Sequence, residues 1–163
     1  MGGHGMIRLL PFNHFPFGDY LIKYLQLTDQ EIVEVIEKKM PKVMVVDDDE
    51  EFTNLYKEYL KMVGFEAISE NHSANAMDLA YVEKPDIFIL DLMMPAPDGF
   101  QLCRMLRADE NFKSTPIIIV TALTNLDSKL VAMGAGANDY ITKPFHIDEL
   151  KTRINLLLEK VKE

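Results

Sequence analysis

The chain has 163 residues, 48% of them hydrophobic, which suffices for one globular domain with a sizeable core and a modest extension. Its net charge of −9 argues against direct binding of nucleic acid, and its single cysteine, Cys103, excludes an internal disulfide framework. Apolar runs stay well short of the roughly 18 residues that cross a bilayer, so we expect a cytoplasmic protein without membrane contact.

Residues 1–40 are expected to form an N-terminal extension, and residues 41–163 the main domain. Residues 1–5 are interpreted as a tag remnant. Beyond them, apolar spacing and a Thr-x-x-Glu capping box predict two short helices, the second at about 29–40. Pro41 ends this helix, because a proline disfavours helical geometry in the residue before it.

The main domain alternates strand and helix patterns five times. In chain order, the predicted elements are a strand at 43–46, a helix at 52–63, a strand at 65–69, a helix at 73–83, a strand at 87–90, a helix at 99–107, a strand at 117–120, a helix at 126–133, a strand at 140–142 and a helix at 147–161. The first helix is expected to bury Leu55, Tyr56 and Leu60, and Ser73 to cap the second. This alternation predicts a parallel sheet covered by helices on both faces.

Charged and polar residues follow four of the predicted strands at their carboxyl ends. They are Asp47, Asp48, Asp91, Thr121 and Lys143. Because the carboxyl ends of parallel strands meet at one edge of a sheet, we expect these side chains to share a crevice. Carboxylates this close repel by roughly 4 kcal/mol per pair at about 4 Å and an effective dielectric of about 20. The cluster therefore calls for a cation, and its oxygen ligands suit Mg²⁺ shared with a phosphoryl group.

Four motifs in the main domain, VVDDD, LDLMMPAPDGF, VTAL and ITKPF, resemble the signature of receiver domains of two-component response regulators of the chemotaxis-regulator type. The likeness covers about residues 42–160. It implies a doubly wound α/β fold with a five-stranded parallel sheet in the flavodoxin-like order 2-1-3-4-5. This strand order comes with the resemblance and not from the residues themselves. The implied function is to accept a phosphoryl group from a sensor histidine kinase or a phosphotransfer protein.

The resemblance also implies a role for each residue of the crevice. Asp91 is expected to accept the phosphoryl group, with Lys143 pairing with it. Mg²⁺ is expected to be held directly by Asp48, Asp91 and the carbonyl of Met93, and by Asp47 through water. The Lys143–Pro144 peptide bond is expected to be cis, which proline makes accessible.

Thr121 and Tyr140 match the switch pair of the family. Thr121 is expected to move toward the phosphoryl oxygen while Tyr140 turns inward, which changes the surface of the last two helices. The chain departs from the common pattern at Met93 and Leu123, where apolar side chains stand at positions that modulate the hydrolytic water. We therefore expect a long-lived phosphorylated state.

Several alternatives stay open at this point. Asp47 and Asp48 can instead cap the first helix, where negative charge is favourable. A phosphatase of the haloacid-dehalogenase kind is disfavoured, because its D-x-D-x-T/V pattern is incomplete here. A phosphorylation-independent scaffold and an excised receiver of a longer regulator also remain. The partners are expected to include an unidentified downstream protein, and a homodimer is left open.

Overall fold

The computed structural model describes residues 40–161 of the chain. The predicted N-terminal extension lies, up to Lys39, outside this range. Within the described range, all helices are too short or too polar to cross a membrane.

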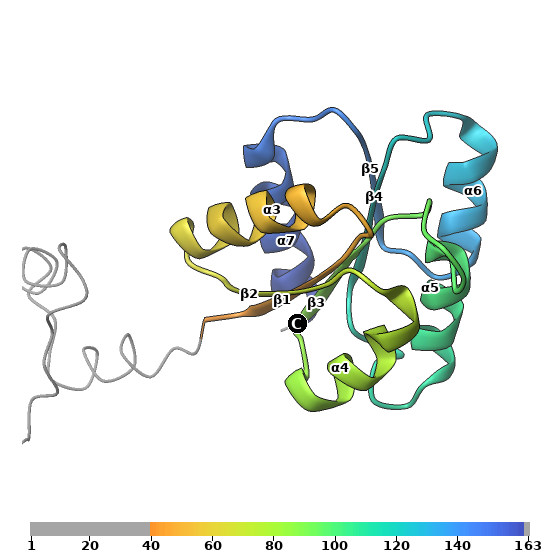
Figure 1. The fold of residues 1–163 in the computed structure, drawn as a ribbon, viewed down its shortest axis with the longest axis horizontal. Coiled ribbons are helices and arrows are strands. Elements are labelled where there is room, and N and C mark those ends of the chain that lie inside the picture. Colours follow the sequence, from red (N-terminus) through yellow and green to blue (C-terminus); the bar gives the residue numbers. More distant parts are fainter. Residues whose placement is uncertain (1–39, 162–163) are drawn as a thin grey trace, which may run out of the picture. The chain divides into compact units, whose positions relative to one another are not determined.

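Five parallel strands form one sheet (Figure 1). They are β1 (Lys42–Val46), β2 (Glu66–Glu70), β3 (Ile87–Leu90), β4 (Ile117–Thr121) and β5 (Asp139–Thr142). The spatial order is β2-β1-β3-β4-β5, which confirms the expected order 2-1-3-4-5. β3 and β4 are buried throughout and apolar up to Thr121, as expected for a parallel sheet covered on both faces. Burial of each isoleucine or valine side chain in these strands stabilises the fold by roughly 1.5–3 kcal/mol.

The connecting segments are helical. In chain order they are α3 (Glu50–Met62), the 3₁₀ turn η1 (Ser73–Asn75), α4 (Ala76–Glu83), α5 (Gly99–Ala108), α6 (Leu126–Gly134) and α7 (Ile147–Val161). Figure 1 shows α3 and α7 on one side of the sheet and α4, α5 and α6 on the other. The predicted elements are thus confirmed in number and type, with ends that coincide or shift by at most three residues.

Side chains alternate between the faces of the sheet and divide the core into two clusters. In the α3–α7 cluster, Val43, Val45 and Ile89 pack with residues of α3 and α7. In the α4–α6 cluster, the intervening strand residues, such as Met44 and Phe88, pack with residues of α4, α5 and α6. Each strand therefore sends every second residue to the same side, and this alternation also governs the residues just beyond the strand ends.

Two local predictions were wrong. Ser73 does not cap α4; its hydroxyl donates to the carbonyl oxygen of Pro95 at 2.8 Å, and the chain forms η1 before α4 begins. Leu55 is 60% exposed, although its neighbours Tyr56 and Leu60 are buried as expected. The apolar stripe of α3 is therefore narrower than the spacing of its apolar residues suggests.

Candidate functional site: an acidic cluster at the carboxyl edge of the sheet

Three strands deliver charged side chains to one point at their carboxyl ends. Asp47, Asp91 and Lys143 each lie two residues beyond a strand residue of the α3–α7 cluster, so the alternation directs all three to that side. Asp48 follows Asp47 directly. The expected meeting of these side chains therefore occurs at this edge, next to the first turn of α3.

The carboxylates of Asp47, Asp48 and Asp91 form a compact cluster. One oxygen from each lies within 4.8 Å of the other two. Asp47 and Asp91 are buried, whereas Asp48 is exposed. Three negative charges face one ammonium group, that of Lys143, so the site carries an excess of negative charge. A hard divalent cation with oxygen ligands fits this donor set.

Lys143 contacts both buried carboxylates. Its Nζ lies 2.7 Å from Oδ2 of Asp47 and 3.8 Å from Oδ2 of Asp91. The ammonium also lies over the ring of Phe52, 3.9 Å from its centroid, in a cation–π arrangement. The Lys143–Pro144 peptide bond is cis, as the resemblance implies. In this state the lysine is therefore engaged mainly with Asp47.

Asp47 is held by backbone and side-chain groups around it. Its Oδ1 accepts from the backbone N–H of Asp49 at 2.9 Å, and its own carbonyl accepts from the side-chain amide of Asn71 at 2.8 Å. Burial raises the pKa of the Asp47 carboxyl, and the hydrogen bond from Lys143 partly offsets this effect. Asp49, not Asp47 or Asp48, caps α3 by accepting from the N–H of Phe52. The capping alternative for the two site residues is therefore wrong.

Both carboxylate oxygens of Asp91 make only long polar contacts. Oδ1 accepts from the backbone N–H of Met93 at 3.4 Å, and Oδ2 has the 3.8 Å contact with Lys143. Gly99 lies so close behind that a Cβ there would sit 2.1 Å from the carbonyl oxygen of Asp91. Only glycine permits this approach, which starts α5 directly against the strand end.

Thr121 and Tyr140 lie on the opposite side from the carboxylates. Thr121 follows Ile117 and Ile119 of the α4–α6 cluster at intervals of two, and Tyr140 belongs to that same cluster. The hydroxyl of Tyr140 donates to the carbonyl oxygen of Leu123 at 2.8 Å. Tyr140 is therefore already turned inward in this structure, against the start of α6.

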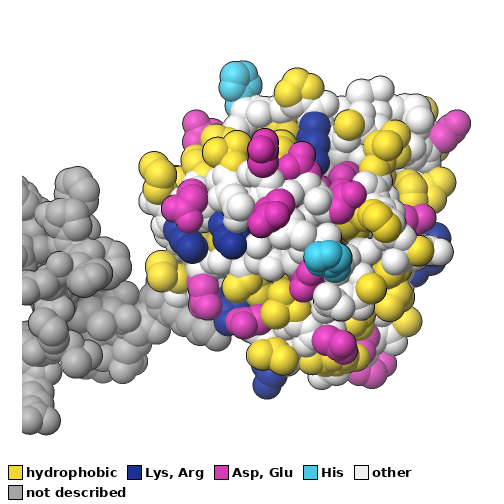
Figure 2. All heavy atoms as spheres, viewed as in Figure 1, with side chains coloured by type: hydrophobic (Ala, Val, Ile, Leu, Met, Phe, Trp, Pro, Cys, Tyr) yellow, Lys and Arg dark blue, Asp and Glu magenta, His cyan; other side chains and the backbone are white. Residues whose placement is uncertain are grey.

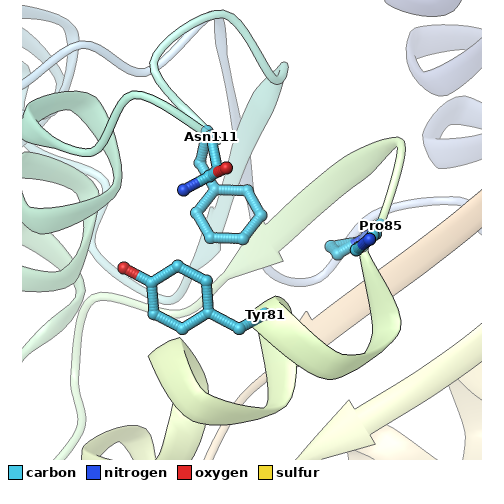
Figure 3. A pocket seen from close by; sticks show the side chains of 5 residues that line it. Tyr81, Pro85 and Asn111 are labelled. Atoms are coloured by element: carbon cyan, nitrogen blue, oxygen red, sulfur yellow. The ribbon is translucent and has the colours of Figure 1, made fainter.

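A surface hollow of the described residues lies away from the acidic cluster. Tyr81, Lys84, Pro85, Asn111 and Phe112 line it, and its volume is about 240 Å³. Figure 3 shows Tyr81 on α4 and Asn111 in the segment between α5 and β4. These segments precede β3 and β4, so the hollow lies at the amino edge of the sheet. The acidic cluster is thus identified by its charged side chains and not by a surface hollow.

Residues 43–155 match the family described as "Response regulator receiver domain". The chain belongs to this family. This receiver is 36% identical over 121 residues to the "DNA-binding dual master transcriptional regulator RpaA" of Synechocystis, a match that covers 74% of the chain and 50% of RpaA. The fold and the two-component signalling class expected from the motifs are confirmed.

Solved structures of other receivers are similar. The Francisella response regulator 1452 receiver domain is 36% identical with a TM-score of 0.69, covering 74% of this chain and 98% of that one. The BeF3-activated receiver domain of Klebsiella pneumoniae RstA is 33% identical with a TM-score of 0.68, covering 72% and 97%. This receiver spans about half the length of the curated relatives it matches. The chemotaxis-regulator subtype stays a prediction.

Two residues near the site were missed by sequence reasoning. Asn71, at the end of β2, donates to the carbonyl of Asp47 and to the hydroxyl of Thr53 at 2.9 Å. Its partners lie 24 and 18 positions away, so local sequence carries no signal for it. Tyr56 was predicted only as a buried residue of α3, and its hydroxyl was not considered.

Proposed function

We propose that this receiver accepts a phosphoryl group on Asp91 and thereby switches a surface that a downstream protein recognises. The observation that supports this proposal best is the meeting of three carboxylates with Lys143 at one strand edge. A structural role alone does not favour such an arrangement, because buried like charges destabilise a fold. An inert scaffold is expected to have lost one of these four groups.

The proposed donor is a phosphohistidine of a sensor kinase or phosphotransfer protein. A carboxylate oxygen of Asp91 forms a bond to phosphorus as the phosphorus–nitrogen bond breaks, and the electron pair stays on the imidazole nitrogen. Lys143 lies within 3.8 Å of the Asp91 carboxylate, so its ammonium can stabilise charge on the phosphoryl oxygens. Hydrolysis by water later restores the carboxylate and releases phosphate.

The acidic cluster is the proposed Mg²⁺ site. Asp48, Asp91 and the Met93 carbonyl would hold the ion directly, and Asp47 through water. Bound there, Mg²⁺ would neutralise carboxylate and phosphoryl charge during the transfer. The exposure of Asp48 fits this role, because it leaves the cluster open to an ion from solvent.

The proposed output involves Thr121 and Tyr140. A phosphoryl group on Asp91 offers acceptor oxygens that the Thr121 hydroxyl can reach by moving toward them. Tyr140 is inward in this structure, where its hydroxyl holds the carbonyl of Leu123. The side chains of α6 include an exposed apolar group, and Figure 2 shows hydrophobic atoms on the edge where α6 lies in Figure 1. The members of this group are Leu126, Leu130, Val131 and Met133.

Acetyl phosphate with Mg²⁺, followed by intact-mass measurement, tests the proposal. The unaltered chain is expected to gain one phosphoryl group per molecule, and Asp91→Asn and Asp48→Ala to gain none while keeping the circular dichroism of the folded protein. Asp49→Ala is the matched control. It removes a neighbouring carboxylate that caps α3, so it should cost about 1 kcal/mol of stability and leave uptake intact. Normal uptake by Asp48→Ala would refute the metal assignment.

A second candidate function concerns the whole protein. RpaA is named a DNA-binding transcriptional regulator, and it is about twice as long as the part that matches this receiver. In such a regulator a separate region would have to contact DNA, because the net charge of these 163 residues is −9. Fluorescence anisotropy with a labelled duplex at low salt should show no binding by these 163 residues. Binding would indicate that the receiver itself contacts DNA.

A further inference from the structure

The hydroxyl of Tyr56 is an anomaly in the core of the receiver. Tyr56 is 2% exposed, and its hydroxyl has no hydrogen-bond partner among the protein atoms of the described residues. Within residues 40–161, it is the one buried side-chain nitrogen or oxygen of which this is true. An unpaired buried hydroxyl is unfavourable compared with the same ring without it, so phenylalanine would suit this position better if packing were the only requirement.

Tyr56 packs against the aromatic residues that lie next to Lys143 at the acidic cluster. Its ring packs edge-on against Phe52, with centroids 4.1 Å apart, and the same Phe52 ring carries the Lys143 ammonium on its face. On the other side it stacks on Phe145, two residues beyond Lys143, with centroids 5.8 Å apart. Tyr56 is thus bracketed by the two aromatic residues that flank the lysine.

The alternation of the strands puts Tyr56 and the site on the same side of the sheet. Tyr56 belongs to the α3–α7 cluster, and Asp47 and Asp91 extend the strand rows of that cluster. The charges of Asp47 and Asp91 both disfavour ionisation of Tyr56, and burial is the main reason that its pKa is raised. The phenol therefore stays protonated and is available as a donor toward these carboxylates.

We propose that Tyr56 is a positioning residue: its hydroxyl donates to the Asp47 carboxylate, directly or through one enclosed water, once Lys143 turns from Asp47 to a phosphoryl group on Asp91. This inference rests on the proposed function of Asp91. In the present structure the Lys143 ammonium lies 2.7 Å from Oδ2 of Asp47, and the Tyr56 hydroxyl makes no hydrogen bond to the protein. When the lysine leaves, the Asp47 carboxylate would keep its hydrogen bond from the backbone N–H of Asp49 but lose the one from Lys143, and the Tyr56 hydroxyl would replace the lost donor.

Binding of beryllium trifluoride with Mg²⁺ tests this role, since BeF3 activates the RstA receiver. Calorimetric affinity for this ligand pair and thermal unfolding without it are measured for the unaltered chain and for Tyr56→Phe. Tyr56→Phe should be at least as stable as the unaltered chain without the ligand, and should bind it about tenfold more weakly, the worth of one hydrogen bond to a charged group. A hydroxyl with only a structural role would not combine unchanged or higher stability with weaker binding when it is removed.

Tyr59→Phe is the matched control. It makes the same change on the same helix, but the Tyr59 hydroxyl donates to Asp148 at 2.6 Å on the surface. Tyr59→Phe should therefore leave the affinity for beryllium trifluoride unchanged. Equal affinity of Tyr56→Phe and the unaltered chain, or a loss of stability in Tyr56→Phe without the ligand, would overturn the role of Tyr56. Failure of the unaltered chain to bind would instead overturn the proposed function of Asp91, and this inference with it.

Discussion

Met93 and Leu123 stand two residues beyond Asp91 and Thr121, and neither side chain can hydrogen-bond a water molecule. Met93 is 57% exposed, and its backbone N–H lies 3.4 Å from Oδ1 of Asp91, so its side chain is close enough to the proposed phosphoacceptor to affect an attacking water. An apolar chain there cannot orient this water toward phosphorus. This is the residue-scale reason to expect slow loss of the phosphoryl group from Asp91.

Met93→Asn should hasten that loss. An amide at this exposed position can orient the water, which we expect to raise the decay rate roughly threefold to tenfold, the worth of about one hydrogen bond. Intact mass followed over time after removal of acetyl phosphate gives the rate. Met105→Asn, a change at an exposed methionine of α5, should leave it unaltered. If Met93→Asn decays no faster, the explanation of the lifetime fails, whereas the role of Asp91 stands.

Asp47, Asp91 and Lys143 could be chosen from the sequence because each is a charged residue that directly follows a predicted strand. Strand alternation then places all three on the same face of the sheet, and the strand order brings them together. Asn71 and the unpaired Tyr56 hydroxyl were not predictable, because a hydrogen bond across 24 residues and the absence of one inside a core both depend on packing. Local sequence records neither.

At the scale of elements, α6 is the segment most directly connected to the proposed switch. It begins five residues beyond Thr121, and Tyr140 holds the carbonyl of Leu123 in the intervening loop. A shift of Thr121 toward the phosphoryl group would therefore alter the loop from which α6 starts. The helix has few buried side chains to resist this motion, with Ala132 the buried one.

Thr121→Ala should separate phosphorylation from this motion. The variant should still take up a phosphoryl group, but hydrogen exchange of residues 122–134 should change on phosphorylation much less than in the unaltered chain. Exchange monitored by mass spectrometry with and without acetyl phosphate gives the comparison. Thr124→Ala, at an exposed threonine of the same loop, should behave like the unaltered chain. An equal response in Thr121→Ala would remove Thr121 from the switch.

The elements themselves were predicted well because buried apolar strands and glycine-terminated helices are strong signals. Gly64, with φ 97°, ends the first helix region as its position suggested. Ser73 failed as a cap because its hydroxyl found a distant acceptor, Pro95, which no local motif reveals. The predicted burial of Leu55 was wrong because the spacing of apolar residues does not determine how wide the buried face of α3 is.

At the scale of the whole molecule, α4 is tied to the end of α5 by a hydrogen bond from the Tyr81 hydroxyl to the carboxylate of Asp109. This bond, followed by those from Asn111, lowers the pKa of the Asp109 carboxyl. A lowered folded pKa stabilises the fold above the ordinary aspartate value of about 3.9, and this contribution is lost as the pH falls through the folded pKa.

Tyr81→Phe should therefore lower the unfolding temperature at pH 7, and the difference from the unaltered chain should shrink as the pH falls below about 4. Thermal unfolding of both proteins, followed by circular dichroism at pH 7 and at a pH below about 4, measures this difference. In an Asp109→Asn background the effect of Tyr81→Phe should no longer depend on pH. A difference that grows in acid would show that Asp109 is not the group responsible.

The division of the core by strand alternation has a consequence for how such a protein can diverge. The proposed phosphate chemistry draws on side chains of the α3–α7 side, whereas the proposed output draws on the α4–α6 side. Mutations that change the surface for a downstream protein and mutations that change the acidic cluster thus fall on largely different sets of residues. The phosphoacceptor site and the docking surface can therefore change separately in evolution, provided that Thr121 still couples one to the other.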